Sequence, residues 1–185
     1  MHQIKRNVGL VFKTFLYQIV MSLFGFMMYS STYKIPFIMT VGQITITVFF
    51  IYIMFHQTYQ QGAKNCEYDH AHDLTSSPFL GFLFSFIAFI PALLLSAYTS
   101  FFPPFAGEVM QSSYPAFLIN KVFLQGMHVG ILQWIFPTGS ADLLQSANAM
   151  NSQCIAHLIC CIPGILAAGA GYWVGYASFK REKRK

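Results

Sequence analysis

Residues Pro78–Phe101 read PFLGFLFSFIAFIPALLLSAYTSF, a stretch without a single charged side chain. An apolar run of about 20 residues is long enough to cross the ~30 Å hydrocarbon core of a bilayer as a helix. Three more runs of this kind lie at about 8–29, 37–59 and 154–179. In lipid the backbone must satisfy its own hydrogen bonds, so each run is expected to be helical. We therefore predict an all-α, polytopic integral membrane helical bundle with four spans.

The composition agrees with this fold class and excludes others. The chain is 55% hydrophobic and only 9% charged, whereas soluble domains are about a quarter charged. Its pI near 9.1 raises the question of nucleic acid, but no basic stripe with interleaved aromatic residues accompanies it, so we predict no nucleic-acid partner. The first apolar run is too long for a signal peptide and lacks a cleavage site. Four cysteines without a regular spacing predict no disulfide.

Basic residues predict how the chain is threaded, because a bilayer keeps Lys and Arg on its cytoplasmic side. They gather near the start of the chain, in a polar loop over 60–77 and in the tail 180–185. Four crossings make all three regions cytoplasmic. A fifth crossing, by Pro115–Phe136, would export the basic tail and place Lys121 in the membrane at a cost of about 2.5–3.5 kcal/mol. We predict four crossings, a multi-pass cell-membrane protein and two cytoplasmic termini.

The segment Pro115–Phe136 is long enough to cross but is more polar than the four spans. Gly126 and Gly130 bracket a Met-His-Val stretch that suits the apex of a re-entrant hairpin on the outer side. Two half-helices of about 10 residues would each reach about 15 Å into the membrane. The alternative is an amphipathic helix that lies in the interface. The predicted fold therefore adds a re-entrant or interfacial helix, within an outer cap over 102–153.

Polar and ionisable side chains at membrane depth are candidates for a binding site or a polar pathway. The best candidate is His128, which could pair with Glu108 and change its charge at mildly acid pH. The alternative is a satisfied histidine at the interface. The set of candidates comprises Gln125, His128, Gln133, Glu108 and His157.

Small residues recur at every fourth position of the last predicted span, at Ala167, Gly171 and Gly175. Such a ridge lets another helix approach closely. The partner is either a helix of the same chain or a second protein, which leaves a membrane protein partner or a homo-oligomer open.

The loop 60–77 contains the densest group of reactive side chains. A thiol, two imidazoles and a carboxylate could bind zinc or another transition metal, and these candidate ligands are Cys66, His70, His72 and Asp73. The alternative is a solvated loop, since paired ligand motifs are lacking. No other cofactor is predicted.

Three short stretches carry a resemblance to known proteins. They are Gly62-Ala63-Lys64-Asn65, Pro78 at the start of the third span, and Gly171-Tyr172-Trp173-Val174-Gly175-Tyr176 in the last span. On these stretches the chain loosely resembles small clostridial membrane proteins with several spans. The resemblance implies a bacterial inner-membrane location and no particular activity, and the insertion Cys66–Asp73 departs from it.

Three classes of function remain for such a chain. The sequence lacks serine-elbow, HExxH and Walker motifs, so we do not predict an enzyme, and a membrane-embedded enzyme is the third class. The first is a small transport-related subunit, either a carrier or a substrate-binding component. The second is a non-catalytic interaction, accessory or immunity-type subunit. In all three classes the lipid bilayer is a predicted partner of the chain.

Overall fold

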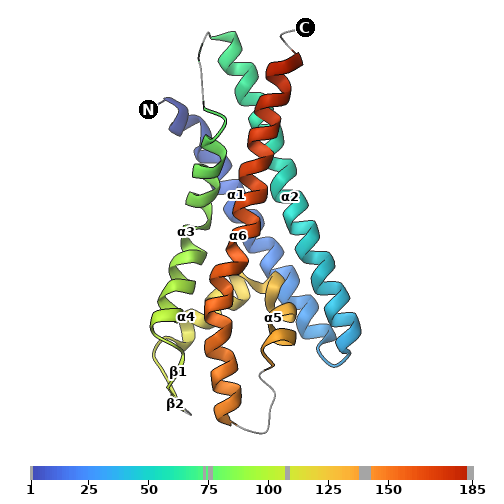
Figure 1. The fold of residues 1–185 in the computed structure, drawn as a ribbon, viewed down its shortest axis with the longest axis vertical. Helices are drawn as coiled ribbons and strands as arrows, with labels where there is room; N and C mark the ends of the chain where they lie inside the picture. The colour runs from blue at the N-terminus through green and yellow to red at the C-terminus, as the bar shows by residue number, and fades with distance from the viewer. Residues whose placement is uncertain (1, 73, 75–76, 107–108, 138–142, 183–185) are drawn as a thin grey trace. The chain divides into compact units, whose positions relative to one another are not determined.

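The computed structural model describes the chain except for residues 1, 73, 75–76, 107–108, 138–142 and 183–185. It is all-α, with 87% of the residues in helices. The long helices are α1 (His2–Thr32), α2 (Pro36–Ala71), α3 (Leu80–Phe101) and α6 (Leu143–Glu182). Between α3 and α6 lie the short elements β1 (Phe105–Ala106), β2 (Val109–Met110), α4 (Tyr114–Ile119), η1 (Asn120–Leu124), η2 (Gly126–His128) and α5 (Val129–Ile135). Figure 1 labels the helices and strands.

Among the described residues, the four long helices are each long and apolar enough to cross a membrane. The side chains of α1 show what this means for packing. Its outward stripe is almost wholly apolar, whereas buried positions on its other side include Asn7, Thr14, Gln18 and Ser22. The outward stripe consists of Val8, Phe12, Leu16, Val20, Phe24 and Met27. This distribution is the reverse of a water-soluble helix, whose polar face points outward, and it suits a lipid environment.

The chain divides into two compact units, and all four long helices contribute to both. Unit 1 comprises residues 1–17, 49–89 and 163–185. Its core is a cluster of Leu10, Cys66, Phe84, Tyr172 and Tyr176. Unit 2 comprises residues 18–48 and 90–162, and it contains the short helices between α3 and α6.

Two predicted loops prove largely helical. Residues 60–71 continue α2 instead of forming the start of a loop, and residues 143–153 belong to α6 instead of the predicted outer cap. The continuation of α2 has a packing reason, because Gly62 lies against the backbone of Tyr172, where a Cβ atom would collide with the Tyr172 carbonyl. The Asn65 side chain also donates to the Tyr172 hydroxyl at 2.8 Å. Contact with α6 therefore stabilises a polar helical segment that local hydrophobicity does not reveal.

A short hairpin follows α3. The strands β1 and β2 pair antiparallel, with Phe105 opposite Met110 and Ala106 opposite Val109. The Asn151 side chain of α6 donates to the Phe105 carbonyl at 2.8 Å, and its own oxygen accepts from the Phe105 N–H at 3.2 Å. This pair of bonds attaches the hairpin to the first part of α6 within unit 2.

Candidate functional site

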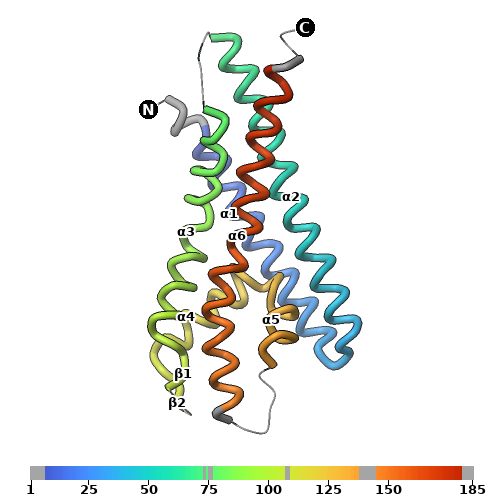
Figure 2. Tube along the Cα trace, viewed as in Figure 1, coloured from blue at the N-terminus to red at the C-terminus, as the bar shows by residue number. Residues whose placement is uncertain are grey.

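The predicted fifth hydrophobic segment is a broken helix. Residues 114–124 and 126–135 form two short helical pieces whose axes meet at 82°, and the tube in Figure 2 turns sharply between them. The turn occurs at Gln125, whose backbone leaves the helical region with φ −130° and ψ 12°. Both pieces are buried around the turn. A break of this kind occurs in a broken span or in a re-entrant loop, and it differs from the single continuous helix of the interfacial alternative.

Glycines allow the break to approach α1. A Cβ atom on Gly126 would collide with the Ser22 carbonyl, and one on Gly25 would collide with the Met127 backbone. Two backbones can come this close only where the residue that faces the other backbone has no Cβ atom. The sequence had marked Gly126 as one boundary of the apex, and the structure adds Gly25 as the position that receives it.

Side chains of α1 and α2 bond the backbone that the break exposes. Irregular backbone is tolerated at membrane depth only where protein or water satisfies it, and here protein does so. Ser22 Oγ donates to the Val122 carbonyl at 2.9 Å and accepts from the Gly126 N–H. The remaining bonds run from Gln18 Nε2 to the Leu124 carbonyl (3.2 Å), from Thr47 Oγ1 to the Met127 carbonyl (3.1 Å) and from the Gly130 N–H to Gln43 Oε1 (3.2 Å).

Three of the predicted site residues gather in unit 2 around this break. Gln125 and His157 are fully buried and His128 is 5% exposed. Gln125 Nε2 donates to Cys161 Sγ at 2.8 Å, and Cys161 is one turn beyond His157 in α6. His128 Nδ1 lies 3.5 Å from Thr47 Oγ1. His157 was expected one turn into the last helix, but α6 begins at Leu143, so several turns precede this buried histidine.

Several buried polar atoms here have no hydrogen-bond partner among the described residues. They are Gln18 Oε1, Asn120 Oδ1, Gln125 Oε1 and both ring nitrogens of His157. The residues are linked, because Gln18 donates to the Leu124 carbonyl and the Gln125 N–H donates to the Asn120 carbonyl at 2.8 Å. An unpaired buried polar group costs about 1–3 kcal/mol. We call Gln18, Asn120, Gln125 and His157 the amide cluster, since three of them present an amide oxygen.

A second polar chain lies next to the cluster. The Lys121 ammonium is 5.5 Å from the centre of the Phe117 ring and donates to Gln153 Oε1 at 3.5 Å. Gln153 Nε2 donates in turn to Gln133 Oε1 at 3.3 Å and to the Phe136 carbonyl at 2.9 Å. The predicted residue Gln133 therefore lies in the same unit as the amide cluster but belongs to this second chain of contacts. The same chain contains the positively charged Lys121 side chain.

The other candidates lie elsewhere. Glu108, the proposed partner of His128, and the metal candidate Asp73 lie outside the described residues. Cys66 is buried in the core of unit 1. The His72 ring stacks on Tyr68 at 4.1 Å, and His70 belongs to helix α2 instead of the predicted loop. Among the residues that the structure describes, no three His, Cys, Asp or Glu side chains are grouped to hold a metal ion.

The small-residue ridge of α6 lies in unit 1, where it packs on α2. A Cβ atom on Gly171 would collide with the Phe55 carbonyl, and one on Gly175 would collide with the Tyr59 carbonyl. Ala167 precedes them by one turn and is half-buried. These two glycines therefore serve a contact within the chain.

Sequence reasoning did not single out Gln18, Asn120 or Gln153 as site residues. The available signal was the presence of a glutamine inside a predicted span, since polar side chains in spans are costly and face the protein interior. In comparisons with known proteins, no family model, curated protein or solved structure matched the chain. The resemblance to small clostridial membrane proteins stays a prediction.

Proposed function

We propose that this chain is an integral membrane protein of a transport system, either a small carrier or a substrate-binding subunit, and that the amide cluster is its ligand site. The observation that carries the proposal is the set of buried, unpartnered polar atoms beside a broken helix. Transporters commonly build their sites from interrupted helices near the middle of the membrane. Polar groups left unpaired in such a place are a cost that a ligand would offset.

The membrane location of the proposal rests on the four long apolar helices and on the outward apolar stripe of α1. We place both termini in the cytoplasm of a bacterial cell, because the basic residues gather on that side in a four-crossing topology. The broken helix then enters and leaves from the outer side, so the ligand would reach the amide cluster from outside.

The chemistry of the cluster favours a small, uncharged polar solute. Three amide oxygens accept hydrogen bonds, so the ligand must donate them. The Lys121 ammonium lies on the same helix, one residue after Asn120, and its charge disfavours a bare cation. A solute with two or more N–H or O–H donors fits these groups.

The accessory-subunit alternative rests on the small-residue ridge and on the near absence of reactive groups in the sequence. Gly171 and Gly175 pack on α2 of the same chain, so the ridge gives little support to a contact with a second protein. We therefore prefer the transport proposal to the accessory subunit. A membrane enzyme would need two or more ionisable side chains, such as His128 and His157, within hydrogen-bond reach of each other, and it remains the third alternative.

Water access to the cluster tests the proposal. In a chain with all four cysteines replaced by alanine, Gln125→Cys is expected to react with a small, membrane-impermeant thiol reagent added outside. The matched control is Ile159→Cys, since Ile159 lies on α6 close to His157 in sequence but is 62% exposed on an apolar surface. It should stay unreactive in lipid. Equal, negligible labelling of both positions would remove the water-accessible pathway and with it the transport proposal.

A further inference from the structure

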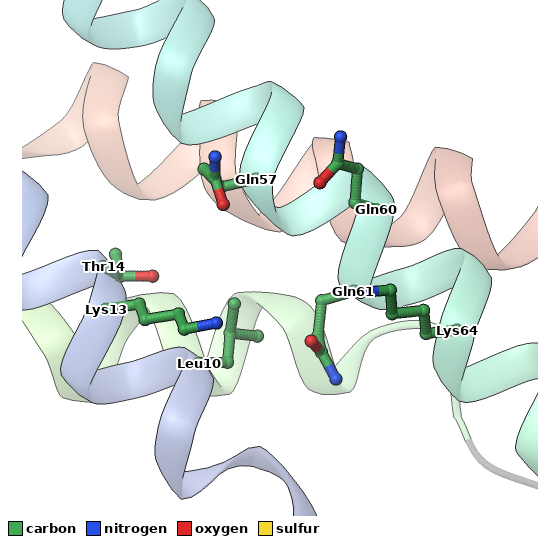
Figure 3. Close-up of a pocket in the computed structure, with 7 residues that line it drawn as sticks. All are labelled: Leu10, Lys13, Thr14, Gln57, Gln60, Gln61 and Lys64. Atoms are coloured by element: carbon green, nitrogen blue, oxygen red, sulfur yellow. The ribbon is translucent and has the colours of Figure 1, made fainter.

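A small cleft in unit 1 lies between α1 and α2. It is lined by Leu10, Lys13 and Thr14 of α1 and by Gln57, Gln60, Gln61 and Lys64 of α2. In Figure 3 the Lys13 side chain extends from α1 toward α2, and the Lys64 side chain lies on α2 beside Gln61. We call this the Lys13–Lys64 cleft.

The cleft carries positive charge without a matching carboxylate in its lining. Neither lysine forms an ion pair with a residue that the structure describes. The nearest described acids along α2 are Glu67, which is exposed, and Asp69, which is buried and accepts from the Tyr176 hydroxyl at 3.1 Å. Two ammonium groups and neighbouring amides therefore offer donors to an anion.

The position of Lys13 means that an anion bound next to it would be stabilising. It lies within the first candidate span, beside the outward apolar residues Phe12 and Leu16. A lysine in such a stretch is costly unless its charged end reaches the interface or a counter-ion. Lys64 lies in the polar last third of α2. The cleft therefore lies where the apolar part of α2 gives way to polar residues.

The size of the cleft limits what it can take. Its volume of about 50 Å³ is room for roughly four water-sized groups. One tetrahedral anion with four oxygens fits this space, whereas a nucleotide or a sugar does not. Gln57 makes no side-chain hydrogen bond to the described residues, so its amide is available to such an anion.

We propose that the Lys13–Lys64 cleft binds a single phosphate group, presented by the headgroup of an anionic phospholipid or by a soluble phosphate. Basic pockets between membrane helices on the cytoplasmic side are suited to acidic headgroups. The lining of the cleft shares no residue with the amide cluster, and the cleft can be occupied whether or not the chain is a transporter.

The experiment compares retention of phosphatidylglycerol, phosphatidylcholine and inorganic phosphate by the purified full chain in detergent. Native mass spectrometry counts bound lipid, and the melting temperature reports stabilisation by each compound. The test variant is Lys13→Gln/Lys64→Gln, which keeps a polar side chain that is one atom shorter and removes both charges. The control, Lys34→Gln/Lys180→Gln, removes the same charge at two lysines outside the cleft lining. A third variant, Lys13→Arg/Lys64→Arg, keeps the charge and should keep binding.

We expect the wild-type chain to retain phosphatidylglycerol in preference to phosphatidylcholine, and the test variant to bind it roughly 30-fold more weakly, since each basic residue near the membrane surface contributes about a factor of five. The control variant should change binding less than threefold. Stabilisation by inorganic phosphate in preference to lipid, lost in the same variant, assigns a soluble phosphate instead. Equal losses in test and control variants, or no stabilisation by any phosphate, overturn the proposal. The melting temperature without ligand shows whether the glutamine variant is folded. If it is not, the arginine variant decides: retained binding supports the proposal, and lost binding overturns it.

Discussion

Gln43 is the side chain whose replacement most directly tests how the broken helix is held. It is fully buried, donates to the Gly25 carbonyl of α1 at 2.7 Å and accepts from the Gly130 N–H of α5 at 3.2 Å. Gln43→Met keeps the length of the side chain and removes both bonds. Interhelical hydrogen bonds in membrane proteins contribute on average about 0.6 and at most about 1.7 kcal/mol each, and an N–H of the break would lose its partner. We expect a loss of about 2 kcal/mol.

The measurement is reversible unfolding of the purified protein in mixed detergent micelles, followed by circular dichroism. A loss of about 2 kcal/mol lowers the ratio of folded to unfolded protein roughly 30-fold. The matched control is Thr45→Val on the outward face of the same helix, whose hydroxyl bonds only the Val41 carbonyl one turn earlier. It should change stability by less than about 0.5 kcal/mol. If Gln43→Met unfolds like the wild type, or if the control loses as much, the bridging role assigned to Gln43 is wrong.

Three further substitutions have definite expected outcomes. Gly171→Ala should destabilise the chain by at least about 2 kcal/mol, because its Cβ meets a backbone carbonyl of α2, whereas Gly9→Ala, which meets nothing within 4 Å, should be neutral or stabilising in the same unfolding assay. His157→Phe removes two unpartnered ring nitrogens, so the melting temperature should stay level or rise; a marked fall would show that the imidazole is bonded. Tyr172→Phe removes the hydroxyl that accepts from Asn65 and should cost about 1 kcal/mol; an unchanged unfolding midpoint would contradict the importance of that bond.

The class of fold and the long helices were predictable because they depend on composition. The uncharged stretch Pro78–Phe101 appears as α3, Leu80–Phe101, within two residues at its start. The break near Gly126 was also predictable, since glycines and polar side chains interrupt an apolar segment there. These features have local causes, which a single sequence displays.

The length of α2 and the full set of site residues could not be predicted from local sequence, because they depend on long-range packing. Residues 60–71 are polar, and polarity indicates exposure to water, not the absence of a helix. Their helix is supported by α6 through Gly62 and Asn65, contacts between segments more than 100 residues apart. Likewise Gln18 is just one polar residue in an apolar span until α1 is placed beside η1. Long-range packing of this kind has no local pattern in one sequence.

The side chains that bond the backbone at the break all precede it in the chain, and this order bears on how the protein is made. Gln18, Ser22, Gln43 and Thr47 belong to α1 and α2, so the ribosome synthesises them well before Asn120–His128. The interrupted segment would then enter a bilayer that already holds its hydrogen-bond partners. In a rearranged gene that encodes the α4–α5 segment first, the same residues would meet lipid without them. The order of the helices along the chain would thus provide hydrogen-bond partners for the interrupted segment as soon as it is inserted.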